Sequence, residues 1–319
     1  MLYRKHLLLR RKNKSISSSY STWIFLRPIA YCAFPNHKNT RLVVILNALI
    51  EISSLFYSYD EEKYALKNIN LNICKNEKIA LIGANGAGKT TFFLSLNGII
   101  KPDSGSIKIK GRIMDYSKNS LIDLRKKTGI VFQEPEIQII GPTVFKEVSF
   151  GPMNLKLPKE EVFEKTNKAL SYMEIEHLSD RSPQYLSGGE KRRVTIADVI
   201  AMEPELILFD EPTANMDCKG IENFEDILHS LHHDGITLLV STHDLDFAYK
   251  WADRILVFHE GEIIGDGTPS DIFTNKGLLE KAAIRKPLVL EMAEILIAEG
   301  ILKEGSNYPR NIQELKNSM

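Results

Sequence analysis

A glycine-rich segment has the residue types and spacing of a phosphate-binding loop, G-x-x-x-x-G-K-[ST]. It follows an apolar run at residues 79–82 and precedes a predicted helix, which is the strand–loop–helix context that such a loop requires. Glycines let successive backbone N–H groups point at phosphate oxygens, and the helix N-terminus adds about half a positive charge. We expect Lys89 to reach the β- and γ-phosphates and the Thr90 hydroxyl to bind Mg²⁺. The predicted ATP-binding residues of this segment are Gly83, Ala84, Asn85, Gly86, Ala87, Gly88, Lys89, Thr90 and Thr91.

Two adjacent carboxylates, Asp210 and Glu211, follow the apolar run at residues 205–209. That run is typical of a buried parallel strand, whose carboxyl end lies at the edge of the sheet where α/β proteins bind ligands. We expect Asp210 to hold Mg²⁺ through its water shell. Glu211 is predicted to orient and deprotonate the attacking water, a role worth about 10²–10⁴-fold. Alone, the pair could equally be solvated acids, but the glycine loop upstream favours the catalytic interpretation.

A second glycine pair stands in Leu186-Ser-Gly-Gly-Glu190, before a predicted helix at residues 190–202. It forms an anion site that the chain's own phosphate loop does not need. The segment resembles the signature motif of ABC ATPases and lies in the family's order before residues 205–212. The resemblance implies that Ser187, Gly188 and Gly189 contact the γ-phosphate of ATP held by a second ATPase subunit. The enzyme would then act as a dimer, with an identical copy or a paralogue.

Three further residues match positions of this family. Tyr59 resembles an aromatic that stacks on adenine, worth about 1–3 kcal/mol by analogy with base stacking; because it has aromatic neighbours, a core role is the alternative. Gln133 resembles the glutamine that joins Mg²⁺ and the attacking water to the transporter interface, the alternative being a solvated loop residue. His243 resembles the switch histidine that contacts the γ-phosphate, although a lone histidine is more often structural.

The loop Ala214-Asn-Met-Asp217 resembles the family's segment that crosses to the other subunit. Asn215 and Met216 depart from its commoner form, a small residue followed by leucine. The departure does not affect the assignment of catalysis, and it leaves the coupling between subunits open.

The elements that must position these residues alternate between strands and helices, which predicts an α/β sheet with crossover helices. The resemblance implies an ABC-type P-loop nucleotide-binding domain at residues 51–277. Its parts would be a mostly parallel core sheet, an antiparallel β subdomain and a helical subdomain at about 134–203. A short C-terminal helical appendix, 278–319, is predicted to contact the second subunit through a largely apolar helix at 287–299. Packing of that helix on its own domain is the alternative.

The charges are unevenly distributed along the chain. Residues 1–50 hold nine Lys or Arg and no acid, which leaves 32 basic against 41 acidic residues in 51–319. A body this acidic makes nucleic acid an unsuitable partner. The basic extension has three interpretations: a transit peptide, an arm on anionic lipid, or disordered or over-extended sequence. Since no run reaches about 18–20 apolar residues, partners must supply any membrane channel.

Several segments resemble the energy-coupling-factor ATPases, including those of cobalt and nickel importers. They are residues 133–138, 142–144 and 150–155, and Arg285-Lys-Pro. The resemblance implies a peripheral ATPase on the cytoplasmic side of the cell membrane. An integral membrane coupling subunit would insert a helix near Gln133, and a separate membrane protein would capture the solute. Cobalt or nickel is the expected solute and a vitamin the alternative.

Two other classes of function fit the sequence less well. ABC proteins acting on nucleic acid or ribosomes usually carry a coiled-coil insertion or tandem cassettes, and this sequence shows neither. A scaffold that binds ATP without turnover would not need the residues retained here, which are Lys89, Asp210, Glu211 and His243.

Overall fold

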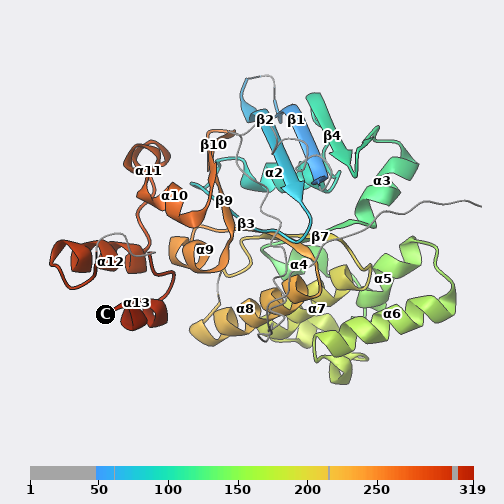
Figure 1. The fold of residues 1–319 in the computed structure, drawn as a ribbon. Coiled ribbons are helices and arrows are strands. Elements are labelled where there is room, and N and C mark those ends of the chain that lie inside the picture. The colour runs from blue at the N-terminus through green and yellow to red at the C-terminus, as the bar shows by residue number, and fades with distance from the viewer. Residues whose placement is uncertain (1–47, 61, 215, 304–307) are drawn as a thin grey trace, which may run out of the picture. The chain divides into compact units, whose positions relative to one another are not determined.

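The computed structural model describes residues 48–60, 62–214, 216–303 and 308–319 (Figure 1). Most of the predicted basic extension, residues 1–50, therefore lies outside the described residues, as does Asn215. Strand β1 begins at Ala48, inside the range predicted as extension. No helix in the described part of the chain is long and apolar enough to cross a membrane.

The central sheet has six strands in the order β10-β9-β3-β8-β7-β6. Five are parallel, and β10 pairs antiparallel with β9 at the edge. Every residue of β7 and β8 is buried, as expected for parallel strands covered on both faces. The strands are β3 (Lys78–Ile82), β6 (Thr128–Val131), β7 (Leu206–Asp210), β8 (Thr237–Ser241), β9 (Arg254–His259) and β10 (Glu262–Gly267).

A second, four-stranded antiparallel sheet has the order β2-β1-β4-β5. It consists of β1 (Ala48–Ser58), β2 (Tyr64–Cys74), β4 (Ser104–Ile109) and β5 (Arg112–Ile113). Helix α2 (Lys89–Leu96) follows β3, and its Phe92, Phe93 and Leu96 are fully buried in one apolar cluster with β1 and β2. Leu124 of helix α3 (Lys118–Arg125) is buried in the same apolar cluster. The antiparallel sheet thus fixes α2, and with it the phosphate loop, against the central sheet.

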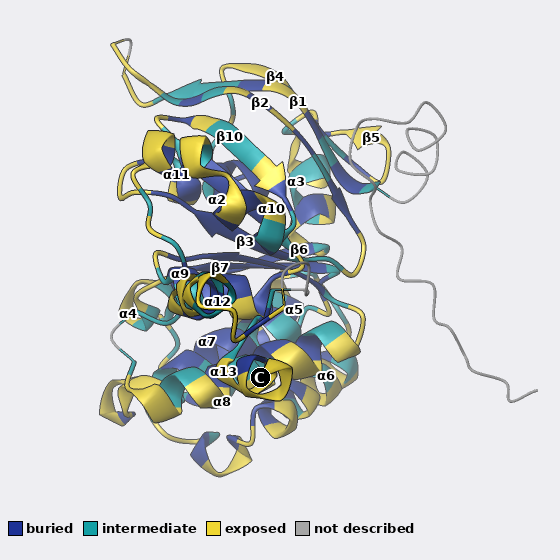
Figure 2. Cartoon of the chain, turned by 60° about the vertical axis from the view of Figure 1, so that its left-hand side comes forward, coloured by how far each residue is buried: buried dark blue, intermediate teal, exposed yellow. Residues whose placement is uncertain are grey.

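The helical subdomain lies on the opposite side of the central sheet from β1 and β2 (Figures 1 and 2). It contains α4 (Pro135–Gln138), α5 (Val144–Asn154), α6 (Lys159–Tyr172) and α7 (Gly188–Ile200), with short 3₁₀ turns at Glu176–Leu178 and Pro183–Tyr185. Helices α5, α6 and α7 pack on one another, and α7 also contacts β6. Helix α8 (Cys218–His233) joins β7 to β8, and α9 (Leu245–Trp251) joins β8 to β9. The described fold confirms the expected ABC-type α/β architecture.

Among the described residues after β10, the helices are α10 (Pro269–Thr274), α11 (Lys276–Ala282), α12 (Leu288–Ala298) and α13 (Ile312–Ser318). Helix α12 buries one face, with Val289, Leu290 and Ala293, in the main apolar cluster. Leu288, Met292 and Ile295 are 58%, 49% and 57% exposed and lie along another face. Packing on its own domain therefore accounts for one face of α12 and leaves an apolar stripe exposed.

Candidate nucleotide-binding site

The loop between β3 and α2 can be built only with glycine at two positions. Gly83 and Gly88 have φ angles of 147° and 107°. A Cβ atom at Gly83 would lie 2.2 Å from the carbonyl oxygen of Phe258, and one at Gly88 would lie 2.6 Å from that of Ala65. Both neighbours are backbone atoms that cannot move aside cheaply. Contacts with β9 and β2 therefore set the shape of this loop within one chain.

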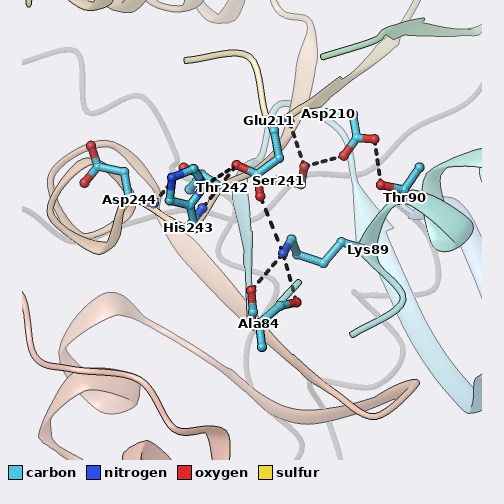
Figure 3. A network of polar contacts seen from close by, with 10 residues as sticks. Ala84, Lys89, Thr90, Asp210, Glu211, Ser241, Thr242, His243 and Asp244 are labelled. Carbon is cyan, nitrogen blue, oxygen red and sulfur yellow. Dashed lines mark hydrogen bonds and ion pairs between the residues drawn. The ribbon is translucent and has the colours of Figure 1, made fainter. Parts of the chain in front are cut away.

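Lys89 is buried and folds back into the loop (Figure 3). Its Nζ donates to the carbonyl oxygens of Gly83 at 2.7 Å and Ala84 at 3.4 Å. The same atom lies 3.5 Å from Oε1 of Glu211. A buried ammonium held by carbonyls and one carboxylate is an attractive site for phosphate oxygens.

Asp210, at the end of β7, uses both of its carboxylate oxygens. Thr90 Oγ1 donates to Oδ2 at 2.8 Å, and Ser241 Oγ donates to Oδ1 at 2.6 Å. Ser241 Oγ also accepts from the backbone N–H of Glu211 at 2.9 Å. The parallel register of β7 and β8, which pairs Asp210 with Ser241, places these groups together. The hydroxyl and carboxylate oxygens of Thr90 and Asp210 are hard donors of the kind that Mg²⁺ prefers, so the residues fit that ion.

Glu211 is held in a restricted conformation beside Lys89. Its φ of 45° lies in the left-handed region that side chains other than glycine seldom adopt. Oε2 accepts from Nδ1 of His243 at 2.8 Å and from the His243 backbone N–H at 3.3 Å. Oε1 is buried and has no hydrogen-bond donor among the described residues. Because buried acceptors are almost always satisfied, this oxygen is suited to accept a hydrogen bond from a bound molecule such as water.

Tyr59 and Gln133 lie at the margin of this network. The Tyr59 hydroxyl is 3.2 Å from Oγ1 of Thr91, and its ring is 63% exposed, so it is not a core residue. The Gln133 side chain is exposed and forms no hydrogen bond with Thr90 or Asp210 in the described network. The structure thus brings together the predicted residues of the loop, Asp210, Glu211 and His243, and does not bring the Gln133 side chain to them.

The signature turn has a different environment. Ser187 caps α7 through a reciprocal capping box: its backbone N–H donates to Glu190 Oε2 at 2.7 Å, and its hydroxyl accepts from the Glu190 N–H at 3.3 Å. A Cβ atom at Gly188 or Gly189 would meet nothing within 4 Å. Both glycines line a surface cavity of about 930 Å³, together with Gln133, Met216 and others, but not with Lys89 or Thr90. In one chain the two glycine turns do not share a pocket.

Arg192 is a site residue that the sequence did not reveal as such. It is buried one turn into α7, and its guanidinium donates to the carbonyl oxygens of Phe132 at 2.8 Å and Gln133 at 2.7 Å. Burial lowers its pKa. The Gln138 side chain accepts from the Phe132 backbone N–H at 3.2 Å on the other side of the loop. The basic run 191–193 was the available signal, but only the fold shows that it reaches Gln133.

Comparisons with known proteins show the family to which this chain belongs. A family model described as ABC transporter matches residues 66–214. The energy-coupling factor transporter ATP-binding protein EcfA2 of Methanospirillum hungatei is 44% identical over 270 residues, which cover 85% of this chain and 68% of that protein. The chain belongs to the ABC transporter ATP-binding proteins of the energy-coupling factor type. As a member of this family, it is an ABC transporter ATPase.

Solved structures of ABC ATPases share the fold. The cbiO1 protein of Clostridium perfringens, part of the ABC transporter complex cbiONQ, aligns with a TM-score of 0.67 and 38% identity, covering 79% of this chain and 99% of that one. A dimeric ATP-binding cassette in a post-hydrolysis state, bound to ADP and Pi, aligns with a TM-score of 0.63 and 31% identity, covering 69% and 98%. For this energy-coupling factor ATPase, they confirm the α/β fold with its antiparallel subdomain.

Proposed function

We propose that this chain hydrolyses ATP to drive an energy-coupling factor importer, and that cobalt or nickel ions are the imported solute. The observation that carries the catalytic part is the buried Oε1 of Glu211, which has no hydrogen-bond donor among the described residues and lies 3.5 Å from the Lys89 ammonium, while His243 holds the other carboxylate oxygen. An acceptor held in this way is preorganised for a water molecule beside a terminal phosphate.

In the proposed mechanism, the N–H groups of residues 83–90 and the Lys89 ammonium bind the β- and γ-phosphates. Thr90 and Asp210 would hold Mg²⁺, and the Gln133 side chain, which does not reach them in this structure, would join them from its loop when nucleotide binds. When bound, the ion would neutralise charge on the phosphate oxygens. Glu211 Oε1 takes a proton from water as the water oxygen bonds to the terminal phosphorus and ADP leaves. His243 holds the other carboxylate oxygen, so that Oε1 keeps its orientation. Tyr59 stacks on the adenine.

We also propose that ATP binds between two ATPase subunits. The open space around Gly188 and Gly189 supports this, because glycine there is not required by this chain's own packing. With Ser187 they would contact the γ-phosphate bound by the other subunit. The relative bound to ADP and Pi is dimeric, which supports the same arrangement. The exposed stripe of Leu288, Met292 and Ile295 on α12 would add a contact between subunits.

The membrane partner would contact the helical subdomain near Gln133, with the chain peripheral on the cytoplasmic side of the cell membrane. Exposed apolar side chains support this location: Ile137 and Ile140 are 66% and 69% exposed, and Phe150 and Met153 on α5 are also exposed. Such a group suits a helix of an integral coupling subunit. A separate membrane protein would capture the solute. The choice of cobalt or nickel rests on the sequence resemblance and on the likeness to cbiO1.

The test is to purify the chain in detergent from cells that make it and to identify the membrane proteins bound to it. We expect an integral coupling subunit and a small solute-capture protein, and vesicles holding the complex should accumulate Co²⁺ or Ni²⁺ only with ATP. The Glu211→Gln complex is the control and should assemble without transport. Copurification of ribosomes or DNA would contradict the transport function, and uptake of a vitamin instead would contradict the choice of metal.

A further inference from the structure

Helix α9 connects the catalytic network to the C-terminal helices. It begins two residues after His243, and Asp244 caps it by accepting from the Phe247 N–H at 3.0 Å. Its inward side chains, among them Phe247 and Tyr249, are buried in the main apolar cluster. With only seven residues, this helix is too short to be stable by itself, so its neighbours must fix its position.

The start of α9 is bonded to the start of α12. Helix α12 begins after Pro287, which has no side chain able to cap it. Asp246, in the first turn of α9, supplies the missing acceptor: its Oδ1 accepts from the Leu288 backbone N–H at 2.5 Å. Its Oδ2 accepts from Arg285 Nη2 at 2.8 Å. The ion pair is partly exposed and contributes little alone, so the cap on α12 is the more important bond.

The end of α9 is bonded to the segment that begins α13. Arg310 donates from Nε and Nη2 to the carbonyl oxygen of Tyr249, at 3.0 and 2.8 Å, and from Nη2 to that of Ala252. The last carbonyls of a helix lack partners within it and carry partial negative charge, so a guanidinium there is favourable. Arg310 is itself placed by α13, because Glu314 Oε2 accepts from its backbone N–H at 2.8 Å.

We propose that the C-terminal helices brace α9 at both ends, and that Asp246 and Arg310 are thereby positioning residues for the His243–Glu211 contact. The two caps link three elements in series: α9 caps α12 through Asp246, and the segment that begins α13 caps α9 through Arg310. A displacement of α12 would act on the start of α9 at Asp246, three residues after His243. A displacement of α13 would act on the end of α9 through Arg310. The exposed stripe on α12 begins at Leu288, whose backbone N–H bonds to Asp246, so a contact made there is one hydrogen bond from a residue that lies three positions after His243 in the chain.

The test uses Arg310→Ala and Asp246→Ala in the full chain, with ATP turnover and hydrogen exchange as readouts. We expect kcat to fall about tenfold, equivalent to about 1.4 kcal/mol, with KM for ATP unchanged. Exchange at the amides of residues 243–252 should rise by a similar factor, while that of residues 79–90 stays the same. Lys316→Ala is the matched control, because it removes an exposed charge from α13 without touching α9, and it should change neither quantity.

Conservative variants separate the brace from loss of folding. Arg310→Lys keeps the charge but not the planar guanidinium that reaches two carbonyls. Its kcat and its hydrogen exchange should therefore lie between those of wild type and Arg310→Ala. Asp246→Asn keeps an acceptor for the Leu288 N–H and should retain most activity. Unchanged kcat and exchange in Arg310→Ala, or equal losses of kcat and ATP affinity, would overturn the proposal.

The proposal rests on the role proposed for His243, and its failure can be told apart from a failure of that role. If His243→Ala leaves turnover unchanged, the proposed role of His243 fails, whatever Arg310→Ala does. If His243→Ala slows turnover and Arg310→Ala does not, only the brace fails.

Discussion

The phosphate loop and the signature turn both place glycines at the start of a helix, yet the surroundings of these glycines are opposite. Gly83 and Gly88 are hemmed in by backbone carbonyls and need glycine for the fold itself. Gly188 and Gly189 face open space, although Leu186 beside them is buried in the main apolar cluster and Ser187 and Glu190 form a capping box. The first turn is complete within one subunit. The open space at the second turn supports the proposal that it contacts ATP bound by another subunit.

The largest effect on turnover is expected from Glu211→Gln, which changes the carboxylate beside Lys89 of the phosphate loop. The amide cannot take a proton from water, so kcat should fall by about 10²–10⁴-fold while ATP binding persists. Because ATP then stays bound, the variant should form a stable dimer in the presence of Mg-ATP, measurable by light scattering. Turnover equal to wild type would refute the role assigned to Glu211.

A matched pair of substitutions separates the two turns. Gly189→Val should leave ATP binding to the isolated subunit unchanged and lower kcat by about 10²-fold, as expected when donors to a transferring phosphoryl group are lost. Gly88→Val should abolish ATP binding, because the new side chain would clash with the Ala65 carbonyl. Calorimetry and steady-state turnover measure both. Loss of ATP affinity in Gly189→Val would show that the signature turn serves its own chain's nucleotide.

The smallest effect on activity is expected at Asp198, on the helix that follows the signature turn, where the predicted change is in the pH dependence of stability. Burial, with the neighbouring Glu147 carboxylate, raises the pKa of Asp198 on α7 from 3.8 to about 7. The folded state therefore binds a proton more tightly than the unfolded state, and this group's contribution to stability is lost as pH rises from about 4 to about 7. Asp198→Asn should remove that loss, so the variant gains stability relative to wild type at pH 8 compared with pH 5. Denaturant titrations at both pH values measure the free energy of unfolding. The same difference between variant and wild type at pH 5 and at pH 8 would contradict this prediction.

Local patterns explain why much of the fold and the phosphate site could be predicted from the sequence. The loop, Asp210 and Glu211 each follow an apolar strand, and parallel strands end at one edge of a sheet. Helix α7 starts two residues before the predicted Glu190, because Ser187 is its cap. The sequence does not predict helix α5, because Gly151 and Pro152 interrupt its pattern, or α9, which is too short to show a helical period.

Contacts between distant segments could not be predicted. Arg192 lies 59 residues from Gln133, and Arg310 lies 61 residues from Tyr249. Each makes its bond with a side-chain fork to backbone carbonyls, which carry no sequence signal at the accepting position. The roles of the individual site residues, and the boundaries proposed for the appendix, stay predictions.

The central claim is that two subunits share each ATP, and mixing two inactive variants tests it most directly. Lys89→Ala disables the phosphate loop and Ser187→Arg the signature turn, so each alone should be inactive. In a mixed dimer one site combines both defects and the other combines two intact halves. An equimolar mixture should therefore recover about a quarter of wild-type turnover, since half of the dimers are mixed and each has one intact site. A mixture as inactive as its parents, or a Ser187→Arg subunit as active as wild type, would contradict the shared site.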